Sequence, residues 1–145
     1  MTSRMPLGSA GAWVICLPLA FALGGCGSSE APSAAAAATR FVDLASRDPG
    51  AACGLLAPRT REKAADDGDG NCAKGLRSSG LPSASSGSDV PDVPPEVAGH
   101  TALVTTSSQA VFLSLFDDGW KVVAAGCTKV SEDAAVPYDC AIQGD

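Results

Sequence analysis

The chain has 145 residues, with 16 acidic and 10 basic side chains and a formal net charge of −6. This length favours one domain. An acidic chain without a basic stripe repels phosphate backbones, so we expect no nucleic-acid partner. Aromatic residues make up only 5% of the sequence, which predicts a thin core that benefits from covalent cross-links.

Residues 1–25 have the pattern of a secretory signal. Arg4 is their only charged residue, and an apolar run extends from Ala12 to Leu23. A membrane-spanning helix needs about 20 apolar residues, more than this run supplies. The positive start and short apolar centre therefore predict a removable signal peptide.

The residues at the boundary, Leu23-Gly24-Gly25-Cys26, resemble a bacterial lipobox. The resemblance implies cleavage before Cys26 and lipidation of its thiol, which would anchor the protein to the outer face of the cell membrane. An ordinary secretory signal and an uncleaved anchor are the alternatives. We expect residues 26–38 to form the lipidated cysteine and a flexible tether, and residues 39–145 to form an extracytoplasmic domain.

Six cysteines are present. Cys16 falls within the signal and Cys26 in the lipobox. The others are Cys53, Cys72, Cys127 and Cys140. An even number outside the cytoplasm predicts two disulfides. Three connectivities are possible, and we favour Cys53–Cys72 with Cys127–Cys140 because each pair is local. The sequence has no C-x-x-C motif and one histidine, so we expect neither a metal site nor a cofactor.

The first half of the remaining chain predicts short helices. Phe41, Leu44 and Ala45 follow helical i, i+3, i+4 spacing. Asp48 followed by Pro49 is typical of a helix start. We expect helices at about residues 34–46, 49–57, 60–65 and 71–79, followed by a low-complexity stretch at 78–95.

The last third predicts β-structure. β-branched and apolar residues favour strands at 101–106, 109–116, 120–127 and 138–142, and Val90, Val93 and Val97 favour an irregular edge strand. Asp117-Asp118-Gly119 predicts a hairpin turn, and a three-residue loop would place Phe116 opposite Trp120. The expected fold is α+β, with N-terminal short helices on one face of a C-terminal antiparallel sheet of about four strands.

Four stretches resemble a family of small actinobacterial lipoproteins of unknown function: Phe41-Val42-Asp43-Leu44, Ala51-Ala52-Cys53-Gly54-Leu55-Leu56-Ala57-Pro58, the run from Asp118 to Cys127, and Pro137-Tyr138-Asp139-Cys140. The order of helices and then strands also resembles the NTF2-like (cystatin-like) superfamily. That resemblance implies a curved sheet wrapped around helices, often with a conical pocket, but it does not fix a function.

One acidic segment resembles the start of a calcium-binding loop. Residues 67–71 place oxygens at the first, third and fifth positions. Calcium needs six to eight oxygen ligands, with Gly at position 6 and Glu at position 12. Cys72 and Ser78 occupy those positions, so we favour a solvated acidic turn.

The other residues that could take part in catalysis or binding are not accompanied by the partners that such a site needs. His100 is the one side chain that titrates near neutral pH without perturbation, but no recognisable nucleophile motif accompanies it. We also considered acid–base pairs and anion-binding cations, namely Asp66 with Asp67, Asp117 with Asp118, and Arg59 with Arg61. Neighbouring side chains on a strand point to opposite faces of the sheet, and carboxylates in turns are usually solvated. We therefore expect the side chains of these three pairs to lie on the surface without forming a site.

Trp120, Phe112 and Phe116 could line a pocket, although a core role is favoured. Without a catalytic set, we expect a non-enzymatic binding or accessory protein that contacts the membrane through its lipid and a cell-surface protein through its domain. A small-molecule carrier or sensor with an NTF2-like pocket is the first alternative. An isomerase- or dehydratase-like enzyme is the second.

Overall fold

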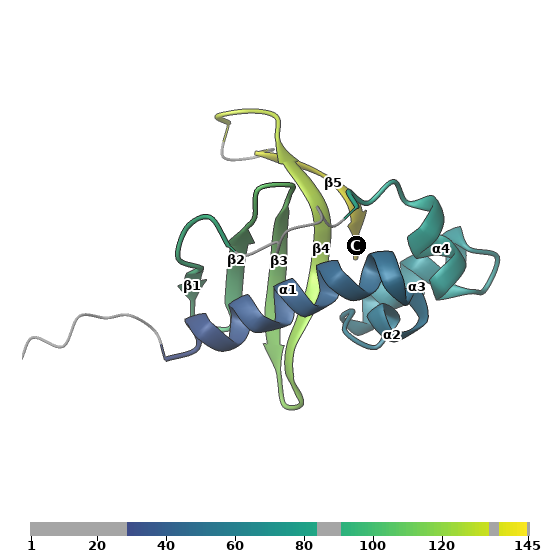
Figure 1. The fold of residues 1–145 in the computed structure, drawn as a ribbon, viewed down its shortest axis with the longest axis horizontal. Helices are drawn as coiled ribbons and strands as arrows, with labels where there is room; N and C mark the ends of the chain where they lie inside the picture. The colour runs from purple at the N-terminus through teal and green to yellow at the C-terminus, as the bar shows by residue number, and fades with distance from the viewer. Residues whose placement is uncertain (1–28, 84–90, 134–136, 145) are drawn as a thin grey trace, which may run out of the picture.

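The computed structural model describes residues 29–83, 91–133 and 137–144. The expected signal, Cys26 and Val90 lie outside this range. Helices precede a five-stranded antiparallel sheet, which confirms an α+β arrangement and corrects the expected strand number (Figure 1). The elements are α1 (Ala31–Arg47), α2 (Pro49–Cys53), α3 (Pro58–Asp67), α4 (Cys72–Ser78), β1 (Glu96–Ala98), β2 (Thr101–Thr105), β3 (Ala110–Phe116), β4 (Gly119–Lys129) and β5 (Tyr138–Gln143).

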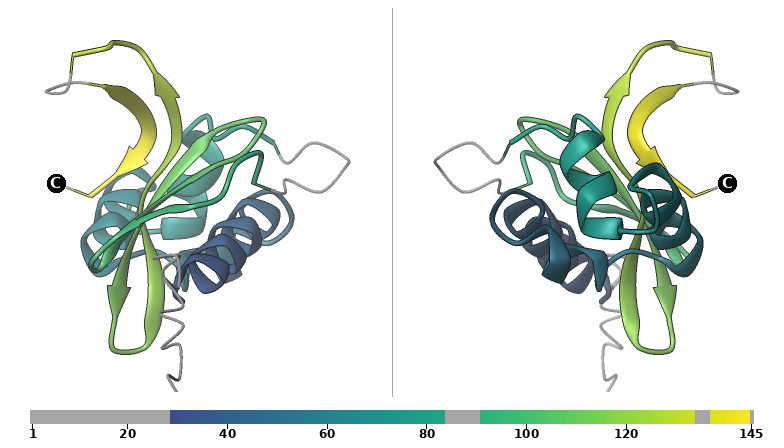
Figure 2. Two further views of the ribbon diagram at one scale, coloured as in Figure 1. Left: turned by 90° about the vertical axis from the view of Figure 1, so that its left-hand side faces the viewer. Right: turned by 90° about the vertical axis from the view of Figure 1, so that its right-hand side faces the viewer.

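Helix α1 crosses one face of the sheet (Figures 1 and 2). It begins at Ala31, with Pro32 in its first turn, where a missing N–H costs no helical hydrogen bond. Ala34 and Ala38 are completely buried. Residues 31–38 therefore belong to the folded domain, which corrects the expected tether of residues 26–38. The small side chains let the helix approach the sheet closely.

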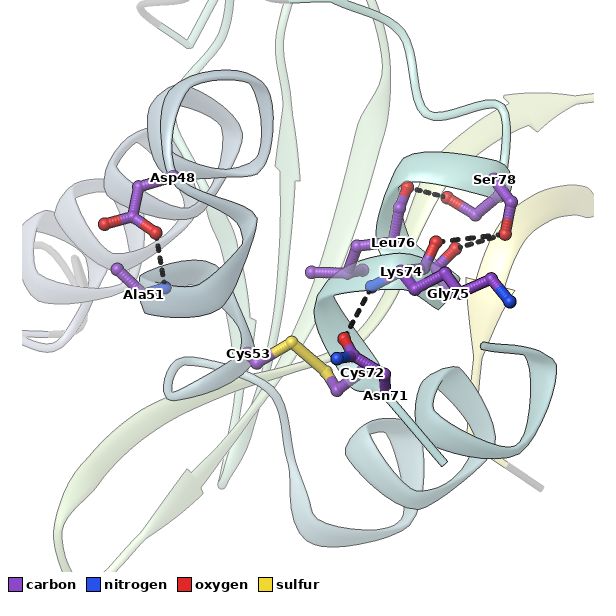
Figure 3. The surroundings of a disulfide bond; sticks show 10 residues. Asp48, Ala51, Cys53, Asn71, Cys72, Lys74, Gly75, Leu76 and Ser78 are labelled. Atoms are coloured by element: carbon purple, nitrogen blue, oxygen red, sulfur yellow. Dashed lines mark hydrogen bonds between the residues drawn. A yellow bond between two sulfur atoms is a disulfide. The ribbon is translucent and has the colours of Figure 1, made fainter. Parts of the chain in front are cut away.

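Helix α2 is shorter than expected. Asp48 caps it by accepting a hydrogen bond from the Ala51 N–H at 3.0 Å (Figure 3). The chain then extends along β4 instead of continuing as a helix to Ala57. Ala57 N–H donates to the Val122 carbonyl at 2.8 Å, and Val122 N–H donates to the Leu55 carbonyl at 2.9 Å. These bonds to β4 replace the helical bonds that the expected longer helix would have made.

The disulfide Cys53–Cys72 joins the end of α2 to the start of α4 (Figure 3). Asn71 caps α4 by accepting from the Lys74 N–H at 2.9 Å. Helices α3 and α4 pack against each other at Gly75, where an added Cβ would lie 1.7 Å from the Ala64 carbonyl oxygen. The helical cluster of α2, α3 and α4 is thus held together by a cross-link and by a close approach of two helix backbones.

All neighbouring strands are antiparallel, in the order β1-β2-β3-β4-β5. At the β3–β4 hairpin, Phe116 pairs with Gly119 and Leu115 pairs with Trp120. The loop therefore has two residues, and the expected pairing of Phe116 with Trp120 is wrong. Gly119 adopts φ +109°, a conformation that glycine accepts readily, and this lets the strands pair one residue earlier.

Strand β4 bends at Gly126, which has φ +66°. Its N–H donates to the side-chain oxygen of buried Gln109 at 2.7 Å. Beyond this point, the β4–β5 ribbon curves away from α1 (Figure 2). Cys127 lies directly opposite Cys140, and the two form the second disulfide, so both disulfides have the favoured pairing.

Candidate functional site

The two faces of the sheet differ in what covers them. The face toward α1 is filled with completely buried side chains from three strands, among them Val104, Val111 and Val122. Phe41 and Val42 of α1 pack into the same core. The conical pocket that an NTF2-like fold would have between helix and sheet is thus filled here by side chains.

The opposite face carries an apolar groove of about 360 Å³. Its floor comes from adjacent strands β2, β3 and β4, through Leu103, Phe112 and Val123. Thr101 and Ser114, which pair across β2 and β3, add hydroxyl groups. Most side chains lining the groove are apolar, as in binding sites for small ligands or for apolar side chains of a partner.

A second apolar cluster bounds this surface on the side of the β4 bend. Ala110, Ala124 and Cys127 form its buried centre. Tyr138, at the start of β5, packs edge-on against Phe112, with the ring centroids 5.1 Å apart. The curvature of the β4–β5 ribbon brings Tyr138 over the sheet, so one side of the uncovered face is walled by an aromatic ring.

Most of the residues that line the groove were not candidates for a binding site from the sequence. Strand β3 reads Ala-Val-Phe-Leu-Ser-Leu-Phe, which is apolar at positions of both parities. Successive side chains point to opposite faces, so this pattern signals that both faces carry apolar groups. Leu103 and Phe112 are on the face away from α1, and they belong to the second cluster rather than to the main core.

The structure does not bring the three candidate aromatic residues together. Phe112 lines the groove. Trp120 is a core residue with 7% exposure, and its Nε1–H donates to Glu30 Oε2 at 3.3 Å and to Ser33 Oγ at 3.2 Å. Phe116 is 40% exposed and borders a separate cleft of about 180 Å³.

The cleft beside Phe116 contains charged groups. Lys121 Nζ lies 2.9 Å from a carboxylate oxygen of Asp118 and 3.4 Å from the Gly54 carbonyl oxygen. The hydrogen bond from Lys121 lowers the pKa of Asp118 from its usual 3.8. Arg61, on α3, lines the same cleft. Lys121 is thus engaged by Asp118, whereas Arg61 has no ion pair with any residue in the described ranges.

The acidic segment at residues 67–71, which resembles the start of a calcium-binding loop, forms ion pairs with two lysines. Asp69 adopts φ +56° and its carboxylate contacts Lys74 Nζ. Asp67 pairs with Lys63 at 2.5 Å. Across residues 29–83, 91–133 and 137–144, no three His, Cys, Asp or Glu side chains gather as potential metal ligands.

His100 lies exposed in the turn between β1 and β2. A polar depression of about 340 Å³ lies elsewhere, between α3, α4 and β5. Its hydroxyl groups donate to backbone carbonyls: Thr60 to Val123 at 3.0 Å, and Ser79 to Leu76 at 2.8 Å. Both bonds give the hydroxyls a structural role: the Thr60 bond joins α3 to β4, and the Ser79 bond caps the end of α4.

None of the helices in the described part of the chain is long and apolar enough to span a membrane. Comparison with models of known families, with curated proteins and with solved structures finds no match to this chain.

Proposed function

We propose that this chain is a membrane-anchored extracytoplasmic lipoprotein that acts as a non-enzymatic binding or accessory protein. Its binding surface is the groove on the uncovered face of the sheet. The observation that carries this proposal is the groove itself, in which Leu103, Phe112 and Val123 form an apolar floor that none of the helices in the described residues covers. Concave sites that are lined mostly by apolar side chains, with a few polar groups among them, commonly bind ligands.

The sequence supports the anchor. Leu23-Gly24-Gly25-Cys26 follows a short apolar run and has the composition of a lipobox. The two disulfides fit an oxidising compartment outside the cytoplasm. Two further parts of this proposal are that the chain belongs to the actinobacterial lipoprotein family and that its fold is NTF2-like (cystatin-like).

Fractionation of cells that express the full chain tests the anchor. Wild-type protein should sediment with membranes, and Cys26→Ser should appear in the soluble fraction, because its side chain forms no thioether with a diacylglyceryl group. Cys16→Ser is the matched control, since it removes a thiol within the signal and should leave sedimentation unchanged. Membrane retention of the Cys26→Ser chain would contradict the anchor.

Photo-crosslinking tests the binding surface. A benzophenone amino acid that replaces Phe112 would lie on the floor of the groove. The same amino acid in place of Glu62, which is exposed on α3, is the control. We expect position 112 to yield a discrete cross-linked protein at the cell surface and position 62 to yield none. Equal labelling at both positions, or none at position 112, would contradict a partner in the groove.

A small-molecule carrier or sensor is the second candidate, favoured by the groove volume of about 360 Å³, which falls within the range of small-ligand sites. A native mass spectrum of the purified protein tests it. A reproducible added mass that disappears in Leu103→Glu supports a ligand in the groove. A clean apo mass, or an added mass that Leu103→Glu retains, counts against it.

A further inference from the structure

The chain between Cys26 and the domain is short. Five peptide steps separate Cys26 from Ala31, where α1 begins. An extended chain covers about 3.5 Å per residue, so these steps span about 17 Å at most. If Cys26 carries the lipid, as proposed above, the start of α1 is held close to the lipid headgroups.

The start of α1 is fixed to the rest of the domain. Trp120 Nε1–H donates to Glu30 and Ser33 at this point, and Ala34 in the next turn is completely buried. Unwinding the helix to lengthen the tether would break these hydrogen bonds and expose Ala34. The segment that links Cys26 to α1 is therefore attached at a fixed position on the folded domain.

That place is at the same end of the sheet as two turns. Trp120 is the second residue of β4, close to the β3–β4 loop, and its strand partner Leu115 donates an N–H to the His100 carbonyl at 2.8 Å. Figures 1 and 2 show the hairpin projecting beyond the helices at this end. We call this region, composed of Glu30, Gly99–His100 and Phe116–Gly119, the hairpin end.

The hairpin end carries groups that suit a phospholipid surface. Phe116 is a large apolar side chain that stays 40% exposed, and phenylalanine is among the side chains that proteins insert at the boundary between lipid headgroups and acyl chains. In the cleft beside it, Lys121 offsets the charge of Asp118, and Arg61 is available for an anion. A cation near the surface is attracted to lipid phosphates.

We propose that the hairpin end rests on the phospholipid surface of the membrane that holds Cys26. The Phe116 ring lies at headgroup level and the Arg61 guanidinium binds a lipid phosphate. The short tether keeps this low-affinity contact at high effective concentration. The opposite end of β4, at Lys129, then points away from the membrane.

Fluorescent labelling of the full chain tests this orientation. The lipidated protein is purified from membranes and reconstituted in vesicles of phosphatidylethanolamine and phosphatidylglycerol. A nitrobenzoxadiazole dye is attached at Phe116→Cys, or at Asp117→Cys as a second hairpin position if the first variant misfolds. Val130→Cys, whose native side chain is 58% exposed just beyond the other end of β4, is the matched control.

We expect blue-shifted, brighter emission at the hairpin positions, with quenching by headgroup-brominated lipid, and water-like emission at position 130. Arg61→Glu should reduce the blue shift, and Arg77→Glu on α4 should not. Water-like emission at all positions on vesicle-bound protein overturns the orientation alone. An unchanged shift in Arg61→Glu overturns the phosphate contact. Release of the protein from vesicles by carbonate overturns the lipid anchor, and the orientation with it.

Discussion

At Gly75, the backbones of α3 and α4 are so close that an added Cβ would clash with the neighbouring helix. Because an added Cβ would meet the Ala64 carbonyl oxygen at 1.7 Å, the two helices would have to separate. Overpacking of this kind costs about 3 kcal/mol. We expect Gly75→Ala to lower the free energy of unfolding in urea by that amount.

Gly50 in α2 provides the control, because an added Cβ there meets its nearest atom, an Asp48 carboxylate oxygen, at 3.3 Å. Alanine favours a helix over glycine, so Gly50→Ala should change stability by less than about 1 kcal/mol. Equal losses in both variants would contradict a special role for the α3–α4 contact.

Asp118 makes the stability of the hairpin depend on pH. The hydrogen bond from Lys121 lowers its pKa in the folded protein below the usual 3.8. Its contribution to stability is therefore present above about pH 3.8 and is lost as the pH falls through the lowered pKa. Asp118→Asn should destabilise the protein slightly at neutral pH and make no difference well below pH 3.8.

Urea titrations of wild type, Asp118→Asn and Asp117→Asn at both pH values check this expectation. Asp117 is the neighbouring loop residue, and the pairing with Lys121 belongs to Asp118. A difference between wild type and Asp118→Asn that grows on acidification would contradict the assigned sign.

At the scale of elements, the hairpin shows how one residue of register changes a surface. The sequence predicts both strands and the turn between them, but a three-residue loop would have placed Phe116 opposite Trp120. In the structure Leu115 takes that place, so Leu115 and Trp120 share the helix-facing side and Phe116 is left exposed. Because side chains alternate strictly, the loop length decides which residues reach solvent.

Sequence patterns predicted the α+β order, the helices and the two local disulfides, since these depend on nearby residues. They did not predict where the domain begins. Ala34 and Ala38 fall within the expected helix at residues 34–46, but the expected domain boundary at residue 39 left them in the tether, and only their packing against the sheet shows that they belong to the core. The groove was missed for a similar reason, because it depends on which face α1 covers.

Removal of the Cys127–Cys140 disulfide should weaken the edge of the sheet. Its cysteines are 13 residues apart, and closing a loop of this size in the unfolded chain is worth about 3 kcal/mol. We expect the double variant Cys127→Ser/Cys140→Ser to lose that much stability in urea. Amide exchange at Ile142 in β5 should accelerate more than exchange at Val104 in β2.

The double variant Cys53→Ser/Cys72→Ser is the comparison. Its cysteines are 19 residues apart, so the loss of stability should be similar, but the faster exchange should fall on α2 and α4. Faster exchange in β5 in both variants would show that the two cross-links do not act locally.

At the scale of the molecule, α1 joins the sheet and the helical cluster into one cooperative unit. Phe41 is completely buried in the core shared by these parts. Phe41→Ala should cost about 4 kcal/mol. Helical circular dichroism and the fluorescence of Trp120 should still change at the same urea concentration. Separate transitions for the two signals would contradict a single cooperative unit.

The bond between Ser33 and Trp120 also has a consequence for how the chain reaches this state. It joins residues 87 positions apart, whereas each disulfide closes a short loop. Helix α1 is synthesised before the sheet, yet β4, the strand that it contacts most, is made near the end. Such non-local pairing slows folding, and a helix in a protein draws most of its stability from the packing of its apolar face rather than from its intrinsic propensity. The docking of α1 is therefore a late event, and burial of the Trp120 indole should be among the last changes seen on refolding.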